Sequence, residues 1–263
     1  FSKIGRGVGV LLHPSALPNS PACGGFGSSA RQWLKCLSEY GISVWQFLPL
    51  GPADSYGSPY SSPSSFAVNP WFLDCNDLLE EGFISESDMR SLPGYQDESV
   101  SRVDFLLAEL RSQKLGERLR ERWSSQPKTR HLAFQLWCKR QFWLDDHALF
   151  MDLRKSFLGI PWWKWPEPLA GYKRSALNRW EAEHKCQLLE HRLLQWHLDR
   201  QWKVVRKIAK EEGVLLFGDL PFYVSHNSAD VWSRRALFSI GPNGELEEQS
   251  GVPPDYFSES GQL

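Results

Sequence analysis

A strand–helix–strand pattern in the first fifty residues constrains the fold of this chain most. A short apolar run within residues 6–14 ends at a proline, and residues 43–49 hold a second such run. Between them, apolar side chains recur at helical spacing over residues 30–40, and Gly41 is placed to end that helix. Two neighbouring strands joined through a helix run parallel. The sequence therefore predicts an α/β fold with a parallel sheet whose strands are buried.

The rest of the chain divides into recognisable segments. Residues 50–70 form a long loop rich in Gly, Pro and Ser, and a loop of this length in a compact protein is usually functional. Residues 100–158 and 174–211 are helical by composition and contain no strand signals, which predicts an inserted helical subdomain. A third buried strand is expected over residues 213–219. Beyond it, Ser228 is placed to cap a short helix, and Asn243-Gly244 indicates a hairpin turn.

Composition excludes several classes of partner. The chain has 263 residues, a net charge of -1 and 41% hydrophobic residues, as in a soluble globular protein. The near-neutral charge argues against a nucleic-acid surface, and no apolar run reaches the ~18 residues of a membrane span. We therefore expect neither nucleic acid nor membrane among the partners. The 13 tryptophans fit either sugar stacking or ordinary packing, and the second is the commoner use of any single one.

Cofactor and metal motifs are missing from the sequence. The five cysteines are scattered without CxxC spacing, which indicates neither a zinc site nor a disulfide framework and favours a reducing, cytoplasmic location. There is no nucleotide-binding glycine motif, nucleophile elbow or HExxH helix. The helical run Asp145-Asp146-His147 is better explained as a solvated helix face than as a metal site, because adjacent helix residues point in different directions.

Three segments follow predicted strands at the edge where parallel α/β proteins place their sites. They begin at His13, at the 50–70 loop and at Asp219. Polar side chains with aromatic neighbours at such an edge suggest recognition of a polyol or sugar. Plainer explanations stay open at this point: a buried, satisfied histidine at position 13, and a structural carboxylate bonded to loop amides at position 219.

Four sequence motifs follow one another along the chain. They are Gly9-Val-Leu-Leu-His-Pro14; Trp45-Gln-Phe-Leu-Pro-Leu-Gly-Pro52 with Tyr56-Gly-Ser-Pro-Tyr60 and Asn69-Pro70; Gly218-Asp-Leu-Pro-Phe-Tyr-Val224; and Gly251-Val-Pro-Pro-Asp-Tyr-Phe-Ser258. With these motifs the chain resembles the amylomaltases, the 4-α-glucanotransferases of glycoside hydrolase family 77, and the resemblance spans nearly the whole chain. The Pro161-Trp-Trp-Lys-Trp-Pro166 segment also looks like that family's helical insertion.

The resemblance implies the N-terminal part of a (β/α)8 barrel with a large helical insertion. Residues 1–99 would hold the first barrel strands and a long substrate loop, 100–211 the helical subdomain, and 212–263 the third strand and a Pro-Pro substrate loop. The family's retaining double displacement uses a nucleophile, an acid/base and a stabilising Asp, all expected beyond Leu263. The chain is therefore expected to be a fragment without catalytic residues of its own. A near-match to the nucleophile motif, around Asp104, is interpreted as a helix start.

The resemblance also implies the ligands, which are α-1,4-glucans and maltooligosaccharides bound without metal or organic cofactor. Tyr60 would stack on or hydrogen-bond a glucose unit, Asp219 would accept from its hydroxyls, and the Pro-Pro loop would cover the glucan. Two other functions stay open, a non-catalytic glucan-binding or regulatory protein and a hydrolytic relative. The predicted substrate-binding residues are Ser58, Tyr60, Asp219, Pro254, Asp255, Tyr256, Phe257 and Ser258, with His13 and Tyr56 as further candidates.

Overall fold

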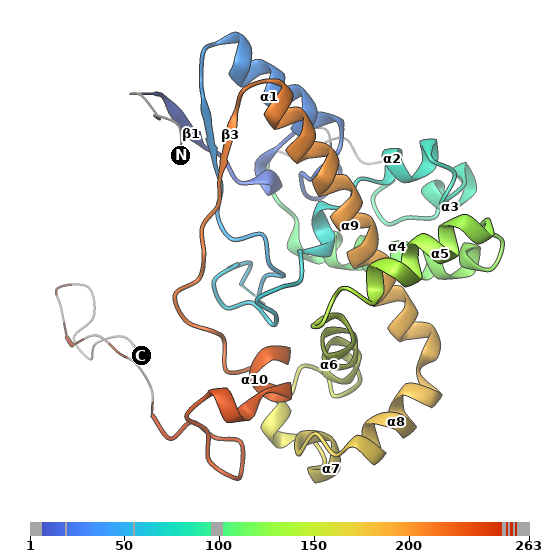
Figure 1. Ribbon diagram of the computed structural model, residues 1–263, viewed down its shortest axis with the longest axis vertical. Coiled ribbons are helices and arrows are strands. Elements are labelled where there is room, and N and C mark those ends of the chain that lie inside the picture. The colour runs from blue at the N-terminus through green and yellow to red at the C-terminus, as the bar shows by residue number, and fades with distance from the viewer. Residues whose placement is uncertain are drawn as a thin grey trace.

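A three-stranded parallel sheet forms one side of the molecule in the computed structural model (Figure 1). The structure describes residues 7–18, 20–54, 56–95, 102–248, 251, 253, 254 and 256. The strands are β1 (Gly9–Leu11), β2 (Val44–Gln46) and β3 (Leu215–Phe217), in the order β1-β2-β3. Both pairs are parallel, so the predicted sheet direction is confirmed.

The register of the sheet decides which side chains are buried. Val10, Trp45 and Leu216 are partners across the sheet, and this row packs into the main hydrophobic core, where Trp45 is fully buried. The alternate residues face the other way, and Leu11 and Phe217 are 55% and 58% exposed. The prediction that the first and third strands are buried was therefore wrong for two of the three residues in each strand. Among the described residues, the main core covers one face of the sheet only.

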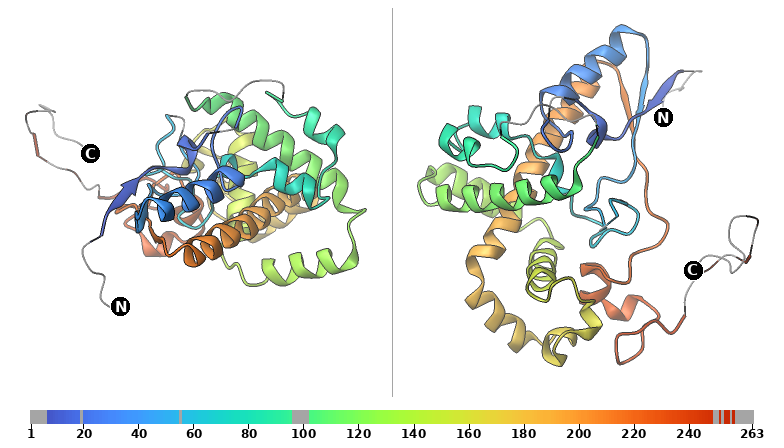
Figure 2. Two further views of the ribbon diagram at one scale, coloured as in Figure 1. Left: turned by 90° about the horizontal axis from the view of Figure 1, so that it is seen from above. Right: turned by 180° about the vertical axis from the view of Figure 1, so that it is seen from behind.

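Helices α1 (Ser28–Glu39) and α9 (Lys185–Glu211) lie side by side along the covered face (Figure 2). Gly41, at φ +69°, ends α1 as predicted, because a left-handed residue there lets the chain turn back into β2. Gly27 precedes α1 where the chain passes the Asp74 carboxylate, and a Cβ built at Gly27 would lie 1.9 Å from Asp74 Oδ2.

The remaining helices form the rest of the molecule and confirm the helical prediction for residues 100–158 and 174–211. One hydrophobic core joins the sheet to α1, α4 and most of α9, and a second lies among α6, α7, α8 and α10 around Trp162 and Trp232. Helix α9 contributes to both, so the domain boundaries stay a prediction. The helices are α2 (Cys75–Glu80), α3 (Glu86–Arg90), α4 (Phe105–Trp123), α5 (Lys128–Cys138), α6 (Leu144–Ser156), α7 (Glu167–Ala170), α8 (Arg174–Glu183) and α10 (Ala229–Ser233), with 3-10 turns at Pro14–Ala16, Pro70–Phe72, Trp162–Lys164 and Arg235–Leu237.

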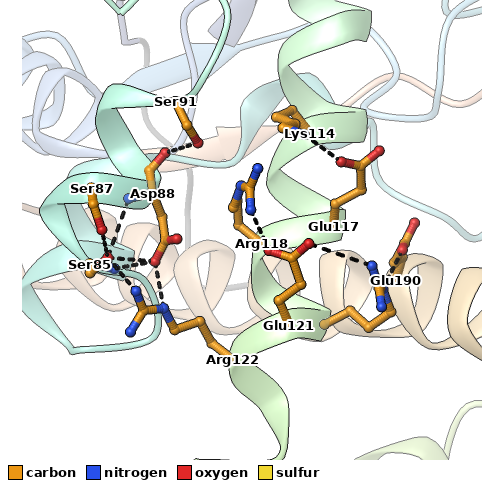
Figure 3. A network of polar contacts seen from close by, with 11 residues as sticks. Ser85, Ser87, Asp88, Ser91, Lys114, Glu117, Arg118, Glu121, Arg122 and Glu190 are labelled. Atoms are coloured by element: carbon orange, nitrogen blue, oxygen red, sulfur yellow. Dashed lines mark hydrogen bonds and ion pairs between the residues drawn. The ribbon is translucent and has the colours of Figure 1, made fainter.

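Charged side chains fix α4 to its neighbours (Figure 3). The Arg122 guanidinium donates to Asp88 Oδ2 at 2.7 Å and to Ser85 Oγ at 2.7 Å, both at the start of α3. On the same helix, Arg120 Nε donates to Glu190 Oε1 of α9 at 2.7 Å. Helix α4 is therefore bonded to elements on two sides as well as packed against them.

Several local predictions are confirmed. The Ser228 hydroxyl accepts from Val231 N–H and caps α10, and the Asp104 carboxylate accepts from Leu107 N–H at 2.9 Å and caps α4. A single antiparallel bridge between Ile240 and Leu246 closes a small hairpin around the predicted turn.

The described residues also bear on the expected classes of site. All five cysteines are free. Asp145 pairs with Arg192, whereas Asp146 accepts from the Tyr172 hydroxyl, so the two adjacent carboxylates do point in different directions. Within the described ranges, no group of three His, Cys, Asp or Glu side chains could hold a metal ion. Nor does any helix in those ranges combine the length and apolarity needed to span a bilayer.

Candidate functional site

The candidate site lies at the carboxyl edge of the sheet. Because the three strands are parallel, the segments that follow them leave the sheet at the same edge. His13 follows β1, the loop of residues 50–69 follows β2, and Asp219 follows β3. The three segments selected from the sequence thus begin on one side of the molecule.

A tight turn shapes the first part of the 50–69 loop. Asp54 Oδ1 accepts from the backbone N–H groups of Tyr56 and Ser58, each at 2.9 Å. The backbone closes the same turn, since Asp54 N–H donates to Ser58 O at 3.0 Å and Gly57 N–H donates to Asp54 O at 3.1 Å. Gly57 has φ +82°, and a Cβ there would lie 2.3 Å from the Phe105 ring. The positive φ and the nearby ring both favour glycine at this position.

Tyr60 and Asp219 meet across this edge. The Tyr60 hydroxyl donates to Asp219 Oδ2 at 2.6 Å, although the two residues are 159 positions apart. This hydrogen bond and the adjacent negative charge raise the pKa of Tyr60, so the phenol stays protonated as the donor. Tyr60 N–H also contacts Ser58 Oγ at 3.4 Å. The structure therefore brings together three of the predicted substrate-binding residues.

The pair presents both chemical features that a sugar ligand requires. The Tyr60 side chain is 43% exposed and offers an aromatic face on which the apolar face of a pyranose can stack. The Asp219 carboxylate is exposed, and its Oδ1 can accept from a ligand hydroxyl in a charge-assisted hydrogen bond. Within the described residues, the hydrogen bond to Asp219 comes from a side chain and not from the loop amides considered as the plainer explanation.

His13 occupies a different environment. Its ring packs edge-on against Phe72, with 5.3 Å between the ring centroids, and burial lowers its pKa to about 4. The Nδ1 atom has no hydrogen-bond partner among the described residues. The described hydrogen bonds do not join His13 to the Tyr60–Asp219 pair, and its assignment to the substrate stays a prediction.

The other candidates lie on exposed loops. Tyr56 is 89% exposed beside the Asp54 turn, and in the Pro-Pro loop Pro254 is exposed and Tyr256 is 96% exposed. Asp255, Phe257 and Ser258 lie outside the described residues.

Residues that were not predicted from the sequence hold the loop in place, among them Asp54 and Asp230. Asp54 organises its tight turn, and an Asp three residues before a Gly was a local signal for that turn. Asp230 of α10 accepts from Ser65 N–H at 2.8 Å, and the adjacent Ala229 N–H donates to Pro63 O at 2.9 Å. No local signal marks Asp230, because its partner lies 165 residues away.

The fold and the site together define a class: a parallel α/β protein with an aromatic–carboxylate pair, suited to sugars, at the carboxyl edge of its sheet. The chain belongs to glycoside hydrolase family 77, described as 4-alpha-glucanotransferase, which its residues 12–263 match. It is 38% identical to the 4-alpha-glucanotransferase of Synechocystis sp. and 37% identical to that of Thermus thermophilus, over 98% and 99% of this chain. The match covers 51% of each of these relatives, so the chain spans about half their length.

A solved relative supports the same assignment. The structure described as amylomaltase from Streptococcus agalactiae in complex with acarbose has a TM-score of 0.90 and 28% identity, over 98% of this chain and 52% of that one. The predicted fold class, the N-terminal part of a (β/α)8 barrel with a helical insertion, is thereby confirmed. Amylomaltase from Corynebacterium glutamicum, at 18% identity and a TM-score of 0.66, shares the fold.

Proposed function

We propose that the full-length protein is a 4-α-glucanotransferase that transfers α-1,4-glucan segments to the 4-hydroxyl of an acceptor glucan or glucose. The observation that carries the proposal is the Tyr60–Asp219 contact, at the position where the sheet's carboxyl edge meets the long loop. Family membership supports the reaction class, and the relative solved with acarbose supports α-glucans and maltooligosaccharides as ligands. A cytoplasmic location remains a prediction.

The proposed reaction is a retaining double displacement. A carboxylate nucleophile displaces the leaving glucan, which a second carboxylic acid protonates, and forms a covalent glucosyl–enzyme; the acceptor 4-hydroxyl then attacks it, giving its proton to the second carboxylate. On the family resemblance, we expect these carboxylates to lie C-terminal to Leu263. The residues described here contribute binding: Tyr60 offers its ring to one glucose unit, and Asp219 accepts from sugar hydroxyls. Such contacts fix the glycosidic bond relative to the reacting groups.

Disproportionation of maltotriose by the full-length protein tests the proposal. The wild-type protein should convert it to glucose and longer maltooligosaccharides. Asp219→Asn keeps the size of the side chain but removes its charge. A charge-assisted hydrogen bond contributes roughly 1.5–3 kcal/mol, so kcat/KM should fall by roughly 10- to 100-fold.

Asp145→Asn is a suitable control, because that carboxylate is also exposed (74%) and lies in the helical block. Equal transfer rates in Asp219→Asn and Asp145→Asn would show that Asp219 does not take part in glucan binding. The same product analysis separates the two other functions: a binding protein forms no product, and a hydrolase releases reducing ends without redistributing chain lengths. The matching family and the relatives named above are 4-alpha-glucanotransferases, so they do not favour either alternative.

A further inference from the structure

The loop that carries Tyr60 is closed at its base and held by helices. Asn69 N–H donates to Leu50 O at 2.8 Å and joins the two ends of the loop. Helix α10 binds the loop at residues 63 and 65, and helix α9 binds it at Val68. The position of Tyr60 therefore depends on the closure of the loop at its base and on its contacts with α9 and α10.

Gln195 of α9 binds both backbone groups of Val68. Its Oε1 accepts from Val68 N–H at 2.9 Å, and its Nε2 donates to Val68 O at 2.7 Å. The side chain is 3% exposed, so water has little access to replace these bonds. Since two opposed hydrogen bonds fix the orientation of a whole residue, Gln195 holds the C-terminal arm of the loop as a neighbouring strand would.

The segment between Val68 and Tyr60 is stiff enough to transmit this restraint. Ser64 Oγ accepts from the N–H groups of Phe66 and Ala67, each at 3.2 Å, and Ser62 Oγ donates to Ser64 O at 2.8 Å. Both serines are buried. A displacement of residue 68 therefore pulls on this bonded turn against its contacts with α10, and through the turn on the chain that leads to Tyr60.

The same helix carries an almost identical contact elsewhere. Gln201 Oε1 accepts from Asp74 N–H at 2.9 Å, and Gln201 Nε2 donates to Asp74 O at 2.8 Å. Gln201 is 4% exposed, which matches Gln195. Asp74 lies beyond the loop and caps α2, away from the arm that ends at Asn69. The two glutamines thus differ mainly in the segment that each one holds.

We infer that Gln195 is a positioning residue for glucan binding, acting through Val68 and the 62–66 turn to keep Tyr60 against Asp219. The inference rests on the proposed function. Without this contact the loop is assembled in a smaller fraction of molecules, and the apparent affinity for glucan falls by that fraction. Bound glucan selects the assembled loop, so the rate at saturation stays nearly constant.

The test compares Gln195→Met with Gln201→Met in the full-length protein. Methionine keeps the length of the side chain and removes the amide, so both variants should lower the midpoint of thermal unfolding by similar amounts. If the loop is assembled in about one molecule in ten, Gln195→Met raises KM for maltotriose about tenfold with kcat within about twofold of wild type. Gln201→Met leaves KM unchanged.

Amide hydrogen exchange provides the second measurement. In Gln195→Met, exchange should become faster in peptides covering residues 56–68, whereas in Gln201→Met it should become faster only around residue 74. Equal KM values in the two variants, or unchanged exchange over residues 56–68 in Gln195→Met, would overturn the inference. A wild-type protein without transfer activity would refute the proposed function instead, and the exchange experiment would still decide whether Gln195 holds the loop.

A second substitution covers the case in which Gln195→Met does not fold. In Gln195→Asn the amide is one methylene shorter and cannot reach both backbone groups of Val68. Its KM should lie between those of the wild type and a tenfold increase. A wild-type KM in a folded Gln195→Asn protein, with wild-type exchange over the loop, would equally refute the positioning role.

Discussion

Two buried histidines should make the protein lose stability as the pH falls below neutral. His147 of α6 is 3% exposed and His197 of α9 is fully buried. Burial, with a contribution from the nearby His191, lowers the pKa of His147 to about 3. Burial also lowers the pKa of His197 well below its usual value, and the Arg200 charge adds to this. The Arg200 guanidinium lies 3.0 Å from His197 Nδ1 and can only donate, so that nitrogen must be unprotonated.

The sign and size of the effect follow from proton binding. An unfolded histidine has a pKa of about 6.5, so below that pH it binds a proton that the buried ring in the folded protein does not bind. The stabilisation is therefore fully present above that value and is lost as the pH falls toward the folded pKa. At about pH 5.5 the His147 ring contributes about 1.3 kcal/mol less stability than at about pH 7.5, and His197 adds a loss in the same direction. This is a substantial part of the roughly 5–15 kcal/mol that stabilises a typical domain.

Urea unfolding at the two pH values, followed by tryptophan fluorescence, measures the loss. The variant His147→Leu has a side chain of similar size that does not titrate. Its loss of unfolding free energy between about pH 7.5 and about pH 5.5 should be about 1.3 kcal/mol smaller than that of the wild type. Lowered carboxylate pKa values, such as that of Asp88, affect both proteins alike and cancel in the difference. An identical loss in both proteins would refute the reasoning.

Three further experiments test other contacts. Arg122→Ala removes the partly exposed link from α4 to α3 and should lower the free energy of unfolding by about 1 kcal/mol in a urea titration; no change would show that the link adds nothing. Gly27→Ala places a Cβ 1.9 Å from the Asp74 carboxylate, whereas Gly41→Ala enters open space and is opposed only by the φ of +69°. Gly41→Ala should therefore lower the free energy of unfolding by about 1 kcal/mol, and Gly27→Ala should lower it by more. The reverse order of melting temperatures would contradict this. Tyr60→Phe keeps the ring but loses the hydroxyl, so KM for maltotriose should rise roughly tenfold at a nearly unchanged melting temperature; an unchanged KM would argue against the pair.

Local patterns in the sequence were enough to predict the parallel strands, the long helices and the edge at which the candidate site residues gather. Tyr60 and Asp219 could be placed at the same edge because parallel strands end together, although nothing in the sequence states that they touch. Exposure of Leu11 and Phe217 could not be predicted, since burial of a strand depends on what covers each face and not on the strand itself.

The contacts that hold the loop were the least predictable part of the site. Gln195 is a polar residue within a buried helical stretch, and that mismatch was its only signal. Its partner lies 127 residues away, so the contact of the amide can be seen only in the folded structure. The same holds for Asp230, whose position at the start of a short helix explains the residue equally well without the loop.

The hydrogen bond between Asn69 and Leu50 closes residues 50–69 into a loop that we expect can be exchanged as a whole. Because its ends are joined at 2.8 Å, we expect that residues can be added to or removed from the part-exposed turn around Tyr56 without moving β2 or α2. A segment exchanged between relatives should dock correctly when it retains the backbone groups that meet Gln195 and Asp230. We therefore expect that exchanging this one loop between relatives changes the ligand preference of this half of the protein, while the sheet and the helices stay unchanged.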